Sequence, residues 1–381
     1  MKTKLILGLL LLAGLIACQP AKKADLLYVG TYSENGSKGI YCYDFYPADG
    51  SFKLEQVTPD SSNPSYVKIA PSKKYLYAVG ETETYKATKG GSVSAYRIDP
   101  VTGNLDSLGT QPTLGLNPCH VEVSPNGKTV VVANYTSGSL AIYPVNEDGS
   151  LGKMVQLIRY HGHGPNKERQ EGPHAHFSHF MKDGSGFAAC DLGTDQVRFF
   201  KFSADSNRYV PAVPASVHVA PGSGPRHLVF SANERHLYVI SEMASTLTVF
   251  EKTADGFDSI QTVSTLPPDY RGEKDGAEIQ MSNNGRFIYC SNRGHNSISV
   301  FNVDKKTGKV NLIQNIPVEG NWPRNFVLDP ENEFLLSANR KSNQISIFSI
   351  NPQSGELSFT GKSIKVPSPV CLEFMAKATS N

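Results

Sequence analysis

A repeated pattern of short segments is the feature that most constrains how this chain folds. Each repeat has an apolar segment opening near a proline, a turn rich in Pro, Asn and Gly, a second apolar segment and a third ending in an aromatic residue. Short β-branched or aromatic segments between turns are typical of β-strands. The period is close to that of a four-stranded propeller blade, roughly 40 to 50 residues. The opening position recurs at Pro64, Pro118, Ala175, Pro225, Gly276, Pro323 and Pro369.

The two ends of the chain predict that the blades close into a ring. Residues 368–374 match only the first strand of a repeat, whereas residues 26–32 match a second strand with no first strand before it. Joining these ends completes one blade and hides two sheet edges that would otherwise invite pairing with other chains. A closed ring cannot be divided without exposing blade faces. We therefore predict an all-β fold, a seven-bladed β-propeller, as a single domain over residues 26–376.

The N-terminus has the pattern of an export signal. Lys2 and Lys4 precede an apolar run over residues 5–16, which is too short to span a bilayer. The run ends Leu-Ile-Ala-Cys at Cys18, which resembles the bacterial lipoprotein box. We expect a signal peptide over residues 1–17, a lipid on Cys18, a tether over residues 18–25 and a place in the cell envelope, periplasmic or surface-facing. The alternatives are a signal peptide cleaved elsewhere and a non-exported apolar tail.

Charge and cysteine content exclude several classes of function. The chain has 37 Lys and Arg against 35 Asp and Glu, and no basic stripe, so nucleic acid is not an expected partner. The five cysteines after Cys18 have no metal or redox spacing, and we predict that they are small buried residues. Cys119 is a candidate nucleophile beside His120, but adjacent residues in a regular strand point to opposite faces.

Two positions of each repeat are expected at one mouth of the ring, because the first strand of a blade begins there and the antiparallel second strand ends there. Guanidinium groups bind phosphate or carboxylate, and a carboxylate or imidazole serves as a base toward water. We therefore predict a site for an anionic small molecule. The polar residues at and beside these positions are Tyr32, Glu81, His120, Tyr135, His176, Arg226, His227, Glu242, Glu278, Arg293, Arg324, Asn325 and Arg340.

Structural alternatives apply to the same residues. Charges at an open mouth are often merely solvated. Arg226 and Glu242 lie on adjacent strands of one blade and are expected to form an ion pair, whose role is either chemical or purely structural. The joint occurrence of arginines, carboxylates and histidines at one mouth favours a site.

A polar insertion before the fourth repeat carries a second cluster of histidines. His161 and His163 are followed by His174 and His176, with His179 beyond them. His-x-His on a strand places both rings on one face, which is one way to bind zinc. No third ligand has a fixed spacing, so we predict no metal and no cofactor, and a positioning or general-base role for one histidine.

Six short motifs stand out along the chain: Tyr-Val-Gly-Thr-Tyr at 28–32, Asn-Pro-Cys-His-Val at 117–121, Gly-Pro-His-Ala-His at 172–176, Gly-Pro-Arg-His-Leu at 224–228, Ser-Asn-Arg-Gly-His-Asn-Ser-Ile at 291–298 and Pro-Arg-Asn-Phe at 323–326. Together they resemble the seven-bladed lactonase family, which includes the propeller-type 6-phosphogluconolactonases and the fungal carboxy-muconate lactonizing enzymes. The resemblance extends over essentially the whole chain after the signal. It implies metal-free lactone chemistry in a cleft at the mouth, with Arg226, Glu242, Arg293 and either His174 or His176 as catalytic residues. Where relatives usually have Asn before the glutamate, this chain has Ser241.

The expected reaction is therefore hydrolysis of a sugar-type lactone, with 6-phosphogluconolactone as the first candidate. Arginines would hold the substrate anion and polarise the lactone carbonyl, while Glu242 or His176 activates water. A phosphogluconolactone is a cytosolic metabolite, so an exported protein would take another lactone or sugar acid, unless Cys18 misleads. The expected substrate-binding residues are Arg324, His227, His120, Glu278 and Tyr32.

Two other functions remain open. A cycloisomerase closing carboxy-muconates would use the same arginines for carboxylates, without net hydrolysis. A non-catalytic envelope propeller would bind a glycan or protein across the mouth, but sugar platforms usually offer more aromatic faces than Trp322 alone. The expected partner is thus a small anionic lactone, with membrane contact only through the lipid anchor.

Overall fold

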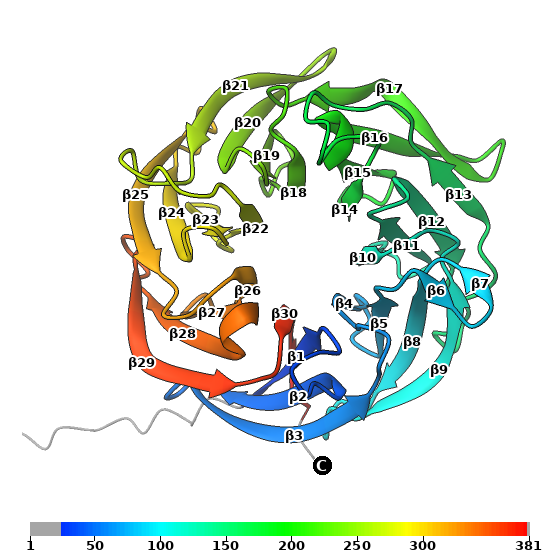
Figure 1. The fold of residues 1–381 in the computed structure, drawn as a ribbon, viewed down its shortest axis with the longest axis horizontal. Coiled ribbons are helices and arrows are strands. Elements are labelled where there is room, and N and C mark those ends of the chain that lie inside the picture. Colours follow the sequence, from blue (N-terminus) through cyan, green and yellow to red (C-terminus); the bar gives the residue numbers. More distant parts are fainter. Residues whose placement is uncertain (1–23, 379–381) are drawn as a thin grey trace, which may run out of the picture.

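The protein, described here by a computed structural model over residues 24–378, is a ring of seven four-stranded antiparallel sheets around a central axis (Figure 1). The predicted seven-bladed propeller is thereby confirmed. The predicted signal peptide, Cys18 and most of the tether lie outside the described residues. Within residues 24–378 there is no long apolar helix of the kind that crosses a membrane.

The strands follow the same order in each blade, from the axis to the rim. The innermost strands are β4 (Val67–Ile69), β10 (Pro118–Val123), β14 (Ala175–Phe180), β18 (Pro225–Phe230), β22 (Gly276–Met281), β26 (Pro323–Leu328) and β30 (Pro369–Ala376). The second strands are β1 (Asp25–Thr31), β5 (Tyr75–Gly80), β11 (Thr129–Asn134), β15 (Gly186–Asp191), β19 (His236–Ser241), β23 (Phe287–Asn292) and β27 (Phe334–Asn339). The third strands are β2 (Gly39–Tyr46), β8 (Ser92–Ile98), β12 (Ser139–Pro144), β16 (Gln196–Ser203), β20 (Thr246–Thr253), β24 (Ser297–Val303) and β28 (Gln344–Ile350). The outer strands are β3 (Ser51–Pro59), β9 (Leu105–Pro112), β13 (Gln156–Arg159), β17 (Arg208–His218), β21 (Gly256–Ser264), β25 (Val310–Pro317) and β29 (Leu357–Lys365).

Small elements decorate the mouth side of the ring. A two-stranded hairpin, β6 (Thr84–Tyr85) with β7 (Thr88–Lys89), follows β5, and two short 3-10 helices, η1 (Leu192–Thr194) and η2 (Arg340–Ser342), follow β15 and β27. All of them come directly after a second strand, so the mouth is built from loops while the blades stay regular.

The ring closes where the two ends of the chain share one blade, as the sequence predicts. Strand β30 from the C-terminal end pairs antiparallel with β1 from the N-terminal end, with Leu27 opposite Phe374. In Figure 1 the red strand therefore lies beside the blue ones. Apolar side chains then pack between blades: Leu27 and Val29 of the closing blade contact a cluster that includes Leu336 and Ile347 of its neighbour. This burial between blades holds the ring together.

A bulge recurs near the start of the innermost strands and re-aims their side chains. In β18 the register shifts between Pro225 and His227, so that Arg226 is the extra residue; β14 and β26 shift in the same way at His176 and Arg324. Equivalent shifts occur in β10 and β22 and where β30 meets β1. A bulge interrupts the alternation of side chains and is common beside active sites. Here it allows two consecutive residues of one strand to face the same cavity.

Candidate active site

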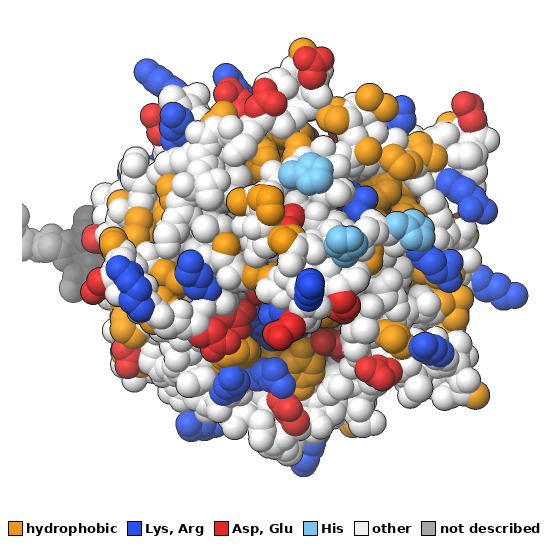
Figure 2. All heavy atoms as spheres, turned by 45° about the horizontal axis from the view of Figure 1, so that its top comes forward, with side chains coloured by type: hydrophobic (Ala, Val, Ile, Leu, Met, Phe, Trp, Pro, Cys, Tyr) orange, Lys and Arg blue, Asp and Glu red, His pale blue; other side chains and the backbone are white. Residues whose placement is uncertain are grey.

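A cavity at the axis, on the mouth side, collects the polar residues of the inner strands. Its interior is small, about 10 Å³. Two of its strands contribute consecutive residues because of the bulges, Arg226 with His227 and Arg324 with Asn325. Figure 2 shows acidic and basic side chains gathered around the hollow near the centre of this face. The lining residues are Ser65, Tyr66, Cys119, His176, Arg226, His227, Glu278, Arg324, Asn325 and Val370.

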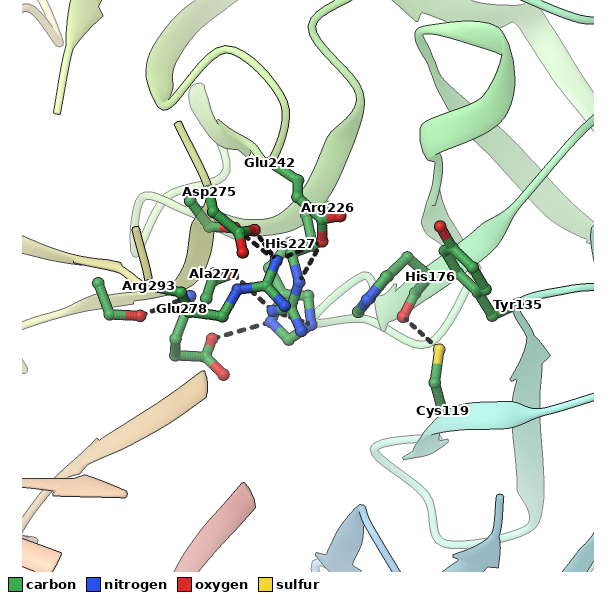
Figure 3. A network of polar contacts seen from close by, with 12 residues as sticks. Cys119, Tyr135, His176, Arg226, His227, Glu242, Asp275, Ala277, Glu278 and Arg293 are labelled. Atoms are coloured by element: carbon green, nitrogen blue, oxygen red, sulfur yellow. Dashed lines mark hydrogen bonds and ion pairs between the residues drawn. The ribbon is translucent and has the colours of Figure 1, made fainter. Parts of the chain in front are cut away.

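Glu242 is the centre of a cluster of arginines at the edge of this cavity (Figure 3). The expected ion pair with Arg226 is present, with 3.1 Å from Nε to Oε2. The same oxygen lies 2.6 Å from Nη2 of Arg293, and Oε1 accepts a hydrogen bond from Nη2 of Arg169. Arg293 also pairs with Asp275. Despite its burial, the pKa of Glu242 is therefore lowered by the arginines, and this carboxylate stays ionised.

The backbone around Glu242 is held by its own blade and by the next one. Its N–H donates to the carbonyl of Gly224, and its carbonyl accepts from the N–H of Gly276. Gly224 has a φ of +66°, and a Cβ there would meet Leu192 and Met243 at 3.0 Å, so a side chain would be both strained and crowded. Beside the glutamate, the Oγ of Ser241 is buried without a hydrogen-bond partner among the described residues.

The two arginines that face the cavity, Arg226 and Arg324, differ in their ion pairs. Arg226 is only 2 % exposed and donates to Glu242 and to the carbonyl of Ala277. Burial and the neighbouring arginines Arg293 and Arg324 lower its pKa to about 10, so it remains a cation at neutral pH. Arg324, in contrast, has no ion pair to an acid within residues 24–378.

Tyr32 and Glu81 form the wall beside Arg324. The Tyr32 ring lies 5.4 Å from the Arg324 guanidinium and 4.4 Å from that of Arg340. Its hydroxyl donates to Glu81, at 3.0 Å from Oε1, and Glu81 also accepts from Ser65. Tyr32 thus supports the arginine from the side of the cavity rather than lining it.

The structure separates the two histidines that the sequence left equivalent. His176 lines the cavity, is 4 % exposed, and its buried Nδ1 has no hydrogen-bond partner among the described residues. His174 instead stacks on the Tyr135 ring at 4.6 Å and lies 3.3 Å from Glu171. Burial, reinforced by Arg226, holds the pKa of His176 well below 6.5. His176 is therefore a neutral imidazole inside the cavity.

Glu278 lies deeper, joined to two neighbouring inner strands (Figure 3). Its Oε1 lies 3.0 Å from Nδ1 of His227, and its Oε2 accepts from Nδ2 of Asn325 at 2.5 Å. Burial raises its pKa to about 7. The cavity and its edge thus hold two carboxyl groups with opposite pKa shifts, because arginines surround Glu242 whereas burial without an arginine or lysine ion pair dominates at Glu278.

Aromatic rings packed at tilted angles enclose His120. His120 is 1 % exposed and lies between Tyr66 at 4.4 Å and Phe177 at 4.2 Å. Phe177 also lies 4.4 Å from the ring of His227. His120, expected to bind substrate, is thus not among the residues that line the cavity.

The remaining candidates lie outside the chemistry or are inert. All five cysteines within residues 24–378 are free and buried, as predicted. Cys119 lines the cavity because of the bulge in β10, but its thiol donates weakly to the carbonyl of His176 and burial raises its pKa, which disfavours the thiolate. His161 and His163 are exposed in the insertion. In the described part of the chain, no three His, Cys, Asp or Glu side chains are arranged to hold a metal ion.

The sequence did not point to two residues of the cluster around Glu242, Arg169 and Asp275. Arg169 belongs to the insertion before β14, where the repeat gives no position to compare, and it reaches Glu242 across the mouth. Asp275 directly precedes the opening position of its repeat, Gly276, so it lies one residue outside the positions that were compared. Extending the comparison by one residue would have found Asp275.

Comparisons with known proteins match nearly the whole chain. Residues 26–374 match the family described as lactonase, 7-bladed beta-propeller. A 6-phosphogluconolactonase of Bacillus subtilis is 36% identical over 350 residues, covering 91% of this chain and 97% of that protein. A 6-phosphogluconolactonase of Formosa agariphila is 34% identical, over 81% of this chain and 87% of that protein. The solved structure of a periplasmic gluconolactonase of Pseudomonas aeruginosa superposes with a TM-score of 0.88 at 35% identity, covering 93% of this chain and 100% of that one.

Proposed function

The chain belongs to the family of seven-bladed β-propeller lactonases, and on this premise we propose that it hydrolyses an anionic sugar lactone, with 6-phosphogluconolactone as the first candidate. The product would be the open-chain hydroxy acid, 6-phosphogluconate. The names of the relatives from Bacillus subtilis and Formosa agariphila support the phosphorylated substrate, and the name of the Pseudomonas aeruginosa relative supports a gluconolactone.

The observation that carries this proposal is an arginine without an ion pair beside a neutral base in one cavity. Arg324 forms no ion pair with an acid among the described residues and is attracted only at longer range by Glu81 and Glu242, so its guanidinium can bind the phosphate or carboxylate of a substrate. His176 lines the same cavity and is neutral at neutral pH, so it can accept a proton from water. A substrate anion on Arg324 would place the lactone ring between these groups and Arg226.

The proposed reaction begins with attack of water on the lactone carbonyl carbon. A ring nitrogen of His176 takes the water proton as the new C–O bond forms. Arg226 donates to the developing oxyanion, and its charge is kept in place by Glu242 and the Ala277 carbonyl. The bond between the carbonyl carbon and the ring oxygen then breaks, and the ring oxygen leaves as a hydroxyl. Glu242 orients arginines in this scheme rather than acting as the base, because its lowered pKa disfavours proton uptake.

The role of Arg324 is tested by Arg324→Gln, assayed with 6-phosphogluconolactone and unphosphorylated glucono-lactone by acid release. Loss of one charge-assisted contact costs about 1.5 to 3 kcal/mol, so KM for the phosphorylated lactone should rise about 10- to 150-fold. KM for the unphosphorylated lactone should change little. Arg340→Gln is the matched control, because Arg340 contacts the other side of Tyr32 and already pairs with Glu34 at 2.9 Å. An unchanged KM in Arg324→Gln would show that this residue does not bind the phosphate, and a wild-type protein inactive on both lactones would refute the function.

We also propose that the protein is anchored in the cell envelope by a lipid on Cys18. This proposal is based on the sequence Leu-Ile-Ala-Cys after an apolar run. The description of the Pseudomonas aeruginosa relative as periplasmic supports a location outside the cytoplasm. Cys18→Ala should move the protein out of the membrane fraction. If wild type and variant fractionate alike, Cys18 carries no anchor.

A further inference from the structure

Glu278 is the acidic side chain of the cavity that forms no ion pair with an arginine or lysine within residues 24–378. Its oxygens accept hydrogen bonds from three neutral donors: Nδ1 of His227 and the Ile279 N–H at Oε1, and Nδ2 of Asn325 at Oε2. Glu242, by comparison, meets three guanidinium groups. Two glutamates of one site are therefore held in different ways, and the proposed mechanism uses only the charged one.

His227 links Glu278 to Arg226 in a defined tautomer (Figure 3). Its Nε2 lies 3.3 Å from Nη1 of Arg226, and a guanidinium only donates, so Nε2 accepts. The ring proton is consequently on Nδ1 and is donated to Glu278, 3.0 Å away. Burial and the adjacent arginines keep the pKa of His227 well below 6.5, so it remains neutral and does not supply a counter-charge to Glu278.

Because Glu278 is buried, its protonated form is favoured more than that of an exposed carboxyl group. Desolvation is the largest cause of its raised pKa, about 7, and Arg226 and Lys68 lower it only in part. A carboxyl group with a pKa close to the working pH is suited to donate a proton. The titratable and charged groups facing it are Tyr66 just before β4, Lys68 on β4, Arg226 and His227 on β18, Cys290 on β23 and Cys371 on β30.

We propose that Glu278, positioned by His227 and Asn325, is the general acid that protonates the ring oxygen of the lactone as it leaves. This inference rests on the proposed lactone hydrolysis and supplies the proton that the reaction needs at its second step. Water gives its proton to His176 and its oxygen to the carbonyl carbon. When the bond from carbonyl carbon to ring oxygen breaks, the electron pair stays on the ring oxygen and the proton of Glu278 goes to it. His176 then returns the water-derived proton to Glu278 through solvent, so no co-reactant is required.

A purely structural role for Glu278, as a buried link between β18, β22 and β26, is the alternative. Glu278→Gln distinguishes the role as general acid from the structural role, because glutamine keeps the size and an acceptor oxygen but cannot donate an acidic proton. With 6-phosphogluconolactone we expect kcat to fall about 10²- to 10⁴-fold with KM nearly unchanged. The wild-type kcat should decline above about pH 7, where Glu278 loses its proton, and the variant should lack this decline. Glu251→Gln is the control: Glu251 pairs with Arg235 at 2.7 Å on the surface and should leave kcat unchanged.

A second measurement requires no variant at Glu278. δ-Valerolactone has an alkyl leaving oxygen that needs protonation, whereas dihydrocoumarin leaves as a phenolate that does not. For the wild-type protein, the decline of kcat above about pH 7 should appear with the first lactone and be absent with the second. Equal pH profiles, or a Glu278→Gln variant that retains wild-type kcat and its alkaline decline, would overturn the inference while leaving lactone hydrolysis intact. A wild-type protein that hydrolyses neither 6-phosphogluconolactone nor these two lactones would instead remove the proposed function itself.

Discussion

Replacement of Glu242 by glutamine is the perturbation whose cost the structure defines best. Glu242 is 5 % exposed and neutralises Arg226, itself 2 % exposed, and Arg293, 5 % exposed. Removing one partner of a buried ion pair costs about 3 to 5 kcal/mol, because it leaves an uncompensated buried charge. Arg293 keeps Asp275 and Arg226 keeps the Ala277 carbonyl, so we expect the lower end of this range. A loss of about 3 kcal/mol corresponds to a fall in Tm of about 4 °C for a chain of this size, at about 2.1 cal/mol/K of unfolding entropy per residue.

The assay is thermal and urea unfolding of wild type, Glu242→Gln and the control Glu251→Gln. Glu251 pairs with Arg235 at 2.7 Å on the surface, where 58 % of the Arg235 side chain is exposed, so the control should lose at most about 1 kcal/mol. The difference in stability between wild type and Glu242→Gln should also depend on pH. Since its pKa is lowered by folding, its stabilisation is present above the ordinary pKa of a glutamate and is lost as pH falls toward the folded value. Wild type and Glu242→Gln should thus converge in stability at acid pH.

The reasoning is refuted if Glu242→Gln unfolds like Glu251→Gln at neutral pH, because the arginines would then not depend on this carboxylate. Activity gives an independent check. Misplacing the Arg226 guanidinium should lower kcat about 10²-fold or more, the usual effect of losing one donor to an oxyanion. If Glu242→Gln is destabilised but fully active, the ion-pair cluster stabilises the fold and has no role in catalysis.

Two further outcomes follow from the same cavity. His176→Asn should lower kcat about 10²- to 10⁴-fold, whereas His174→Asn should retain most activity, because His174 stacks on Tyr135 outside the cavity; equal effects would contradict the assignment. Incubation with EDTA should leave hydrolysis unchanged, since guanidinium groups act as the electrophiles in the proposed mechanism, and a chelator-sensitive rate reversed by added metal would refute that part of it.

Much of the site could be predicted because each repeat marks the same place in space. Arg226, Arg324, His227 and Glu278 were found by comparing equivalent positions of different blades, and all four line the cavity. His120 occupies an equivalent position, yet it does not line the cavity, because neighbouring aromatic rings enclose it. Position in the repeat therefore predicts which end of the strand a residue occupies, but packing decides whether its side chain reaches the cavity.

The amino-acid sequence by itself determined the blades, their number and the closure of the ring, because hydrophobic alternation and turn residues are local signals that recur with each repeat. Only the tertiary structure decided the charge state of the site. Glu242 and Glu278 are the same residue type, and their opposite pKa shifts come from their surroundings in space: arginines from three segments lower the pKa of Glu242, and burial raises that of Glu278. Electrostatic energies depend on distance and burial in three dimensions, and neither quantity is written in the spacing of residues along a chain.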